Sequence, residues 1–299
     1  MADSKYIVDN NHYDLGKDVF HKRHEVKEIH PLLLKIVLEL DRICRKYNIG
    51  YALSFGSALG IYNYQGFIPW DDDIDVAIDY FDIQRLIEAF KSDLKEEFSF
   101  DCYEDNKRFN VLIPTFKLRL KNSYIKETYH WTLPNRCQNG DGIFIDIVAF
   151  MGVPKDKKEH IKLLKYAKHR MVYYVALDAF LRIQPYRLKE KLKNYEKAVA
   201  NSYRHSDYVS QTVIIPFQDW AEKKENLAFP REVIYPFKEY EFCGHKLYSF
   251  NDLEMFCKLC YGQKALKKEV NGILIDPQPT KYRKAKHSKT YNLYSNSKR

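Results

Sequence analysis

The sequence predicts an α+β fold in which helices flank a mixed β-sheet and the C-terminal half is rich in helix. Short apolar runs bounded by turn residues, such as "IGYALSF" and "GIFIDIVAF", are typical of buried strands. Apolar residues that recur every three or four positions predict helices between and after these runs. The chain has 299 residues, 45% of them hydrophobic and 15% aromatic, which supplies a sizeable packed core.

The first half of the chain is expected to alternate helix and strand. A first helix should begin at Pro31, because proline suits the first helical turn. "IGYALSF" then predicts a short buried strand, and "GSALG" predicts a tight turn. A further helix should follow an N-terminal cap at Asp82. The apolar stripes of the two helices are Leu33, Ile36, Val37, Leu40, Cys44 and Tyr47, and Ile83, Leu86, Ile87, Phe90 and Leu94.

Two strands complete a first unit that we place at residues 1–154. "VLIPTFKLRL" predicts an edge strand, because Pro114 cannot donate a hydrogen bond to a neighbouring strand. "GIFIDIVAF", at 142–150, predicts a central strand that is apolar on both faces apart from Asp146.

The remainder divides into a mainly helical region, 155–280, and a basic tail, 281–299. Residues 155–203 are rich in lysine and tyrosine and show helical spacing. "SFNDLEMFCKLCYG" predicts one more helix, which ends at Gly262. The tail is polar as well as basic, and we expect it to be flexible.

Charge and apolar runs restrict the location of the protein. The formal net charge of +9 fits attraction to phosphates or to an anionic membrane surface. The N-terminal residues show no signal-peptide pattern, and the longest apolar run, "MVYYVALDAFL", is too short to span a bilayer. We therefore expect a cytoplasmic protein with at most peripheral, weak contact with the inner face of a membrane. Its cysteines should be reduced, and Cys257 and Cys260 fall on one helical face with Phe256, which favours core packing over zinc.

The stretch "PWDDDIDVAI" is the most acidic feature of the chain. If it forms a strand, Asp71, Asp73 and Asp75 share one face and apolar side chains share the other. Adjacent carboxylates repel one another, and a bound divalent cation relieves that repulsion. A solvated acidic loop is the plain alternative. A calcium-binding EF-hand is excluded, because Val76 stands where that loop requires glycine.

Two features near the aspartates favour catalysis. Gly56 and Ser57 lie at the turn upstream, where glycine lets a phosphate approach backbone N–H groups at a helix start. Downstream, Asp146 is a lone acid in an apolar strand. An ionised carboxylate there needs an ion pair or a metal ion, because its burial is otherwise costly.

Taken in order, these motifs resemble the active site of the nucleotidyltransferase fold. In more detail they resemble the LicD family, which also includes fukutin and fukutin-related protein. The resemblance covers about residues 30–262, and "GFIPWDDDID" is its most specific part. It extends through "KYNIGYALSFGSALG", "TFKLRLKNSYI", "GIFIDIVAF" and "YPFKEYEFCGHKLYSFNDLEMFCKLCYG". Residues 1–154 would then be a catalytic core of this fold.

The resemblance implies a phosphotransferase. Its donor would be a CDP-activated alcohol, and its acceptor a hydroxyl of a cell-surface glycan or of a lipid-linked precursor. Phosphorylcholine is the expected group, with phosphoribitol and phosphoglycerol as analogues. Asp73 and Asp75 would bind Mg²⁺, or alternatively Mn²⁺, with Asp146 as the third acid; Asp146 or Asp71 would act as the base. The implied donor contacts are Gly56, Ser57 and Lys117.

Some positions depart from the family pattern or allow two interpretations. Asn63 and Tyr64 stand where the family usually has a basic pair, which affects donor contacts. The basic segment after Gly262, "QKALKKEVNGILIDPQP", is longer than usual and affects acceptor recognition. Trp70 either belongs to an aromatic cage for a quaternary ammonium or is a hydrophobic anchor beside Pro69.

Two other functions stay open. A nucleotidyltransferase would use the same three acids to add NMP to RNA or to a small molecule. A non-catalytic nucleic-acid-binding protein would use the basic helices and the tail. The sequence contains no aromatic–basic RNA-binding module, so we expect no nucleic-acid partner.

Overall fold

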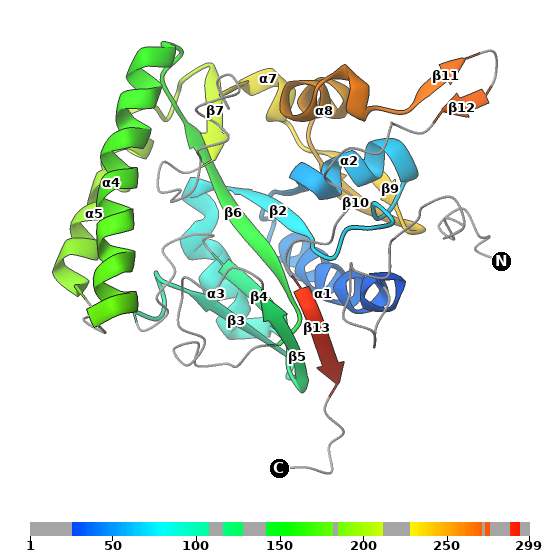
Figure 1. Cartoon of the computed structure of the whole chain (residues 1–299), viewed down its shortest axis with the longest axis horizontal. Coiled ribbons are helices and arrows are strands. Elements are labelled where there is room, and N and C mark those ends of the chain that lie inside the picture. The colour runs from blue at the N-terminus through cyan, green and yellow to red at the C-terminus, as the bar shows by residue number, and fades with distance from the viewer. Residues whose placement is uncertain are drawn as a thin grey trace.

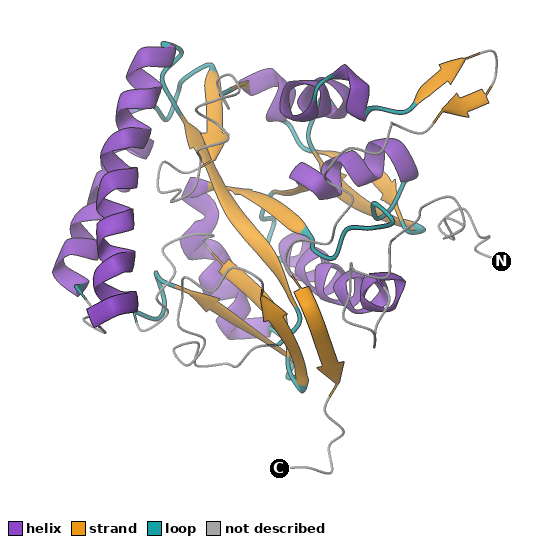
Figure 2. Cartoon of the chain, viewed as in Figure 1, coloured by secondary structure: helices purple, strands orange, loops and turns teal. Residues whose placement is uncertain are grey.

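The computed structural model describes residues 26–107, 116–127, 142–181, 185–211, 228–270, 273–275 and 288–293. It confirms the predicted α+β class. A sheet of parallel and antiparallel strands runs through the middle of the molecule, and helices lie on both sides of it (Figure 2).

The helices of the described residues vary widely in length. They are α1 (Val26–Lys46), α2 (Phe55–Tyr64), α3 (Ile83–Asp93), α4 (Lys157–Leu181), α5 (Tyr186–Ser202), α7 (Arg231–Ile234) and α8 (Leu253–Tyr261), with short 3₁₀ turns η1 (Tyr80–Asp82) and η3 (Gln263–Ala265). None of them combines the length and the apolar character that crossing a bilayer requires.

The main sheet draws its strands from both halves of the chain. They are β1 (Tyr51–Leu53), β2 (Asp75–Asp79), β3 (Phe98–Cys102), β4 (Phe116–Leu120), β6 (Phe144–Gly152), β7 (Tyr208–Gln211), β8 (Phe229–Pro230), β9 (Lys238–Phe242) and β10 (His245–Ser249). Their order is β3-β4-β6-β2-β1-β10-β9, with β7 paired to β6 and β8 paired to β7. Two small sheets pair β5 (Ser123–Glu127) with β13 (Ser288–Leu293) and β11 (Lys268–Val270) with β12 (Ile273–Ile275).

One face of the sheet is covered by α1 and α3. The ring of Phe90, on α3, lies 6.2 Å from the ring of Phe116, on β4, measured between centroids. Side chains alternate along a strand, so Lys117 and Arg119 project from the opposite face of β4. The apolar stripe of α1 is buried as predicted, apart from the partly exposed Tyr47. The charged residues of β4 therefore lie on the face that α1 and α3 leave uncovered.

The two halves of the chain share one sheet. The expected division at 154/155 falls between β6 and α4, yet β7 pairs with β6, and β10 pairs with β1. Helices α4 and α5 lie side by side at one end of the molecule (Figure 1), as the basic helical pattern predicts. They pack around a smaller apolar cluster that includes Met171, Leu192 and Val199.

The start of the first helix differs from the prediction. Helix α1 begins at Val26, and Pro31 lies inside it rather than at its first turn. The missing N–H of Pro31 removes a single backbone hydrogen bond, to the carbonyl of Lys27 close to the helix start, so the helix tolerates it.

The predicted tight turn "GSALG" is wrong as well. Gly56 and Ser57 lie in the first turn of α2, which follows β1 almost at once. Phe55, with φ of 46°, makes the abrupt change of direction. Helix α2 is apolar on several sides because it is largely buried, so its sequence lacks the periodicity that marks a surface helix.

Two further predictions are corrected by strand pairing and capping. Strand β4 pairs with β3 and β6, so it is not an edge strand; Pro114 precedes it and lies outside the described residues. The apolar stripe of α3 packs inward as expected, but Asp82 makes no capping hydrogen bond, whereas Asp79 caps η1 by accepting from the N–H of Phe81. Within the tail that we expected to be flexible, β13 pairs with β5.

Candidate functional site

A row of charged residues crosses the strands on the face away from α1 and α3. Asp75, the first residue of β2, lies opposite Asp146 on the parallel strand β6. Lys117 on β4 lies opposite Asp146, and Asp101 on β3 lies opposite Lys117. Register partners project from the same face of a sheet, so these four side chains share a face. In the order of the row, the single cation Lys117 lies between two of the three acids.

The two cations of β4 are buried and form ion pairs in this row. Lys117 Nζ donates to Asp146 Oδ1 at 2.8 Å, and Lys117 is only 5% exposed. Arg119 Nε donates to Asp101 Oδ2 at 3.0 Å, and the Arg119 guanidinium also donates to the carbonyl of Gly142. The sequence predicted that Asp146 needs an ion pair or a metal ion. Lys117 provides the ion pair.

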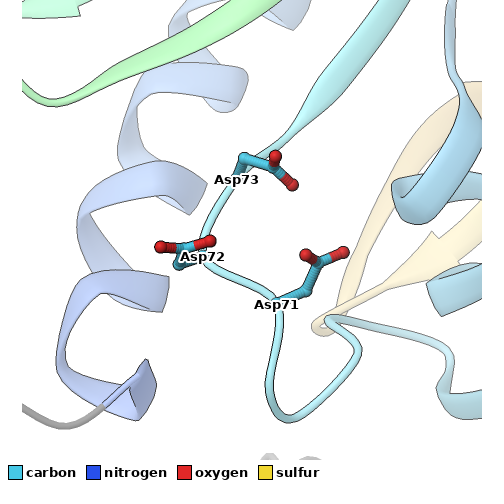
Figure 3. A group of neighbouring side chains, drawn as sticks. All are labelled: Asp71, Asp72 and Asp73. Carbon is cyan, nitrogen blue, oxygen red and sulfur yellow. The ribbon is translucent and has the colours of Figure 1, made fainter. Parts of the chain in front are cut away.

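Three consecutive aspartates form a second acidic group directly before β2. One oxygen from each of Asp71, Asp72 and Asp73 can be chosen so that all three lie within 4.8 Å of one another. Figure 3 shows the Asp71 and Asp73 carboxylates on one side of the chain and Asp72 on the other, toward α1. The expectation that Asp71 and Asp73 share a side is confirmed. The expectation of a strand through them is wrong, because β2 begins only at Asp75.

One residue of this acidic group falls outside the sequence-based site, and the predicted metal ligands do not all lie in one group. Asp72 was given no role, yet it is 2% exposed and lies with its neighbours. The predicted metal set of Asp73, Asp75 and Asp146 divides between the two groups: Asp73 lies in the loop, whereas Asp75 faces Asp146 across the sheet.

Helix α1 holds the acidic loop in place through His30. The Nε2–H of His30 donates to the carbonyl of Asp71 at 2.7 Å, and the imidazole stacks on Phe67 at 4.1 Å between centroids. Burial lowers the pKa of His30 to about 4, against the opposing effect of the bond to Asp71. His30 is thus neutral at pH 7. Sequence reasoning gave this residue no role, because the histidines of the chain show no spacing typical of metal ligands or of a catalytic triad.

The first turn of α2 touches both acidic groups. A Cβ atom added to Gly56 would lie 2.7 Å from Asp71 Oδ2, so only glycine allows this approach without a shift of the carboxylate. Ser57 Oγ accepts a hydrogen bond from the backbone N–H of Asp75 at 3.1 Å. The structure therefore brings Gly56 and Ser57 to the carboxylates, although as part of a helix rather than a loop.

Tyr261, the last residue of α8, is influenced by the charges of the acidic groups, and sequence reasoning gave it no role. The pKa of its phenol is raised well above the usual range, first by burial of the hydroxyl and then by negative groups that include Asp75 and Asp71. The residue as a whole remains 39% exposed. The sequence feature that could have pointed to Tyr261 is its place in the "YG" pair at the end of the C-terminal motif.

The two departures from the family pattern in α2 have structural roles. The side chain of Asn63 is buried and binds the backbone of Ala265 and Lys267. Tyr64 packs edge-on against Trp70, with 6.2 Å between ring centroids. Tyr64 and Ile68 form a small buried cluster on which Trp70 packs, which favours the anchor interpretation of Trp70. As predicted, Cys257 lies in the core and Cys260 packs against it.

The described acids suit a hard divalent cation. Every candidate ligand atom is a carboxylate oxygen, the ligand type that Mg²⁺, Mn²⁺ and Ca²⁺ prefer. The close approach that Gly56 allows leaves the Asp71 carboxylate against the N-terminal turn of α2, where partial positive charge favours anions. The site therefore fits the cation that the sequence predicts.

We predict that Gly56→Ala disrupts the site while leaving the fold stable. The new Cβ would displace the mobile end of the Asp71 side chain rather than any backbone atom. Thermal stability should change little, whereas the affinity for Mg²⁺, measured by calorimetry, should fall by about tenfold or more, the order given for losing a positioned group around a metal ligand. Gly50→Ala is the matched control, because its Cβ would meet only the ring of Phe237. Unchanged Mg²⁺ affinity in Gly56→Ala would remove Asp71 from the metal site.

Comparison with known proteins shows what the chain is similar to. Residues 48–171 match the family described as LicD/FKTN/FKRP, nucleotidyltransferase domain. Over 223 residues the chain is 25% identical to the lipopolysaccharide cholinephosphotransferase LicD of Haemophilus influenzae, a match that covers 75% of this chain and 74% of that relative. Over 74 residues it is 34% identical to the uncharacterized protein RT0683 of Rickettsia typhi, covering 23% of this chain and 24% of that protein. Both acidic groups, Lys117 and Gly56 lie within the matched domain, whereas Tyr261 lies outside it.

Proposed function

We propose that this chain, whose residues 48–171 match the LicD family model, is a transferase that moves a phospho-alcohol group onto a hydroxyl. The preferred group is phosphorylcholine, with phosphoribitol and phosphoglycerol as analogues. The donor is a CDP-activated alcohol, and the acceptor is a cell-surface glycan or its lipid-linked precursor. The relative from Haemophilus influenzae carries the name of a lipopolysaccharide cholinephosphotransferase, which favours phosphorylcholine.

The observation that carries the proposal is the meeting of two acidic groups at one helix start. The loop acid Asp71, which is grouped with Asp73, lies beside Gly56. The strand acids Asp75 and Asp146 lie opposite each other, and the backbone N–H of Asp75 donates to Ser57. Carboxylates at this density suit a cation-bound diphosphate, and a helix N-terminus favours phosphate oxygens.

The reaction follows from the chemistry of the proposed donor. The oxygen of the acceptor hydroxyl attacks the phosphorus that carries the alcohol, the bond from this phosphorus to CMP breaks, and CMP leaves. Asp146 or Asp71 receives the proton of the attacking hydroxyl. Lys117, held by Asp146, contributes positive charge close to the transferred phosphate.

Asp73, Asp75 and Asp146, together with Asp71, are the residues that would hold Mg²⁺ or Mn²⁺. When bound, the ion would neutralise charge on the donor diphosphate and stabilise the leaving CMP. The protein's own contribution is to fix the carboxylates: His30 holds the loop, and Ser57 holds the first residue of β2.

A donor screen tests the function directly. The full chain is incubated with Mg²⁺, lipopolysaccharide and CDP-choline, CDP-ribitol or CDP-glycerol in separate reactions. We expect CMP release and a phosphorylcholine mass increment on the acceptor with CDP-choline. Pyrophosphate release from a nucleoside triphosphate, with NMP added to RNA or a small molecule, would instead support the rival nucleotidyltransferase. No product with any donor would overturn the proposal.

The proposal places the reaction at the inner face of a membrane, where a lipid-linked acceptor is accessible to a cytoplasmic enzyme. Attachment would be weak and would use the basic residues after Thr280, each worth about 1 kcal/mol near an anionic leaflet. These residues are Lys281, Arg283, Lys284, Lys286, Lys289, Lys298 and Arg299.

Sedimentation with anionic vesicles tests this attachment. We expect the full chain to bind at low salt and to dissociate at high salt, because exposed charges are screened over about 10 Å at 0.1 M. A chain that ends at Thr280 should bind less. Since this truncation also removes β13, its melting temperature serves as the folding control. Equal vesicle binding by both chains would rule out the tail as the contact.

A further inference from the structure

A shallow surface hollow lies between helix α2, strand β9 and the start of helix α8, two helices that pack side by side (Figure 1). Its volume is about 450 Å³, within the range of small-molecule binding sites. The aromatic and polar residues of its lining are Tyr62, Lys238, Tyr240, Asn251, Asp252 and Glu254. The hollow is therefore distinct from the two acidic groups.

The hydroxyl groups of both tyrosines hold their rings in place. Tyr240 donates to the carbonyl oxygens of Phe250 and Asn251, which lie 2.9 Å and 3.2 Å from its hydroxyl. The Tyr62 phenol, whose pKa is raised first by burial and then by the charge of Glu254, also donates to the Glu254 carboxylate. Each ring thus contributes a fixed, mainly apolar surface to the lining before any ligand binds.

The polar groups of the hollow offer both donors and acceptors. Glu254 forms an ion pair with Lys258, one helical turn further along α8, and Asp252 caps α8 by accepting from the N–H of Met255 at 2.9 Å. A carboxylate has about four acceptor sites on its two oxygens, so these contacts use only part of its capacity. The Lys238 ammonium adds donors.

This combination suits a sugar better than a quaternary ammonium. A sugar ring has an apolar C–H face that packs on an aromatic ring, and its hydroxyls both donate and accept hydrogen bonds. A quaternary ammonium has no N–H to donate, and it is bound best by aromatic rings beside negative charge. Here the negative charge of Glu254 is compensated by Lys258, and Lys238 adds positive charge.

Both helices that border the hollow lead to the acidic groups. On α2, Gly56 lies against Asp71, and Tyr62 follows about 9 Å further along the helix, at 1.5 Å per residue. On α8, Leu253 lines the hollow, and Tyr261, about 12 Å further along the helix, is influenced by the charge of Asp71. A few linked sugar residues span such a distance.

We propose that the hollow between α2, β9 and α8 binds one sugar residue of the acceptor glycan, a few residues away from the hydroxyl that attacks the donor. This inference rests on the proposed function and deepens it, because it assigns a subsite for the acceptor. The ligand class is an uncharged saccharide unit. Tyr62 and Tyr240 provide the surface on which the ring packs, and Glu254 accepts hydrogen bonds from its hydroxyls.

Calorimetry with the lipid-free oligosaccharide of lipopolysaccharide tests the inference on the full chain, without any donor. Tyr62→Leu should weaken binding by about tenfold, the order expected for the loss of one aromatic contact. Glu254→Trp, a change at an exposed position, should fill the hollow and weaken binding without altering the core. Tyr173→Leu is the matched control, because it removes a tyrosine that is exposed on α4. The melting temperature of each variant reports folding.

Two further measurements separate this subsite from other uses of the hollow. During turnover, Tyr62→Leu should raise the KM for the acceptor by about tenfold while kcat and the KM for the donor stay close to the wild-type values. Lys238→Met should retain most of the affinity for the oligosaccharide. If Lys238→Met abolishes binding and Tyr62→Leu does not, the ligand is recognised by its charge and the inference is wrong.

The remaining outcomes distinguish this inference from the proposed function. If the wild type does not bind the oligosaccharide, or if Tyr62→Leu and Glu254→Trp both bind it as the wild type does, the inference is wrong even where CMP is released. Binding of phosphorylcholine that depends on Tyr62 would also overturn it. If the oligosaccharide binds through Tyr62 but no CDP-alcohol is turned over, the sugar subsite stands and the proposed function fails.

Discussion

Asp73→Asn and Asp75→Asn are each expected to reduce turnover to below a tenth of the wild-type rate, because loss of a charged metal ligand should cost several kcal/mol of transition-state stabilisation. The two residues represent the two acidic groups: Asp73 lies in the loop with Asp71, and Asp75 lies opposite Asp146 on the sheet. Turnover is measured as CMP release with the donor that the screen identifies. Asparagine keeps the size of the side chain, so circular dichroism and the melting temperature should stay close to those of the wild type.

The control for these variants is Asp105→Asn, at an exposed carboxylate that pairs with Lys91 on the surface. It should keep full activity. If Asp75→Asn loses activity but Asp73→Asn retains it, the metal site consists of the sheet acids alone, and the loop acids act elsewhere. If both variants retain more than about a tenth of the rate, the essential metal role that we assign to them is contradicted.

The second large effect is expected at the ion pair between Lys117 and Asp146. Lys117→Met should destabilise the protein by about 3 kcal/mol, the low end of the range for breaking a buried pair, because Asp146 loses a partner at 2.8 Å. Asp146→Asn should stop catalysis and also lower stability. The clustering of negative charges alone would predict a gain in stability for Asp146→Asn, but the buried ammonium of Lys117 reverses that expectation.

The double variant Lys117→Met/Asp146→Asn isolates the interaction. We expect it to be less destabilised than the sum of the two single variants, as measured by urea unfolding, since neither residue then leaves a buried charge behind. Lys91→Met, which removes an exposed ion pair, should change stability little and serves as the control. If the losses of unfolding free energy simply add in the double variant, Lys117 and Asp146 contribute to stability independently. The charge of Lys117 would then serve the donor phosphate and not the Asp146 carboxylate.

Much of this protein could be predicted from local sequence. Helix α3 and the helix of "SFNDLEMFCKLCYG" were predicted because one side of each faces the core and repeats with helical period. The strand "GIFIDIVAF" was predicted as central because an apolar run with one acid suits a strand buried on both faces. The sequence singles out Asp71, Asp73 and Asp75 because adjacent carboxylates repel one another, and Asp146 because an acid in an apolar strand is costly without a partner.

Only the tertiary structure decided how these residues meet. Helix α2 was missed because burial on several sides removes the polar face that gives a periodic pattern. The pairing of Lys117 with Asp146 depends on the register of two strands that are distant in sequence. His30 contacts Asp71 from a helix whose position is set by packing across the core. Local sequence determines which residues carry charge and which segments can be buried. Long-range pairing and packing determine which of those charges lie side by side, because that depends on contacts between segments that no local pattern encodes.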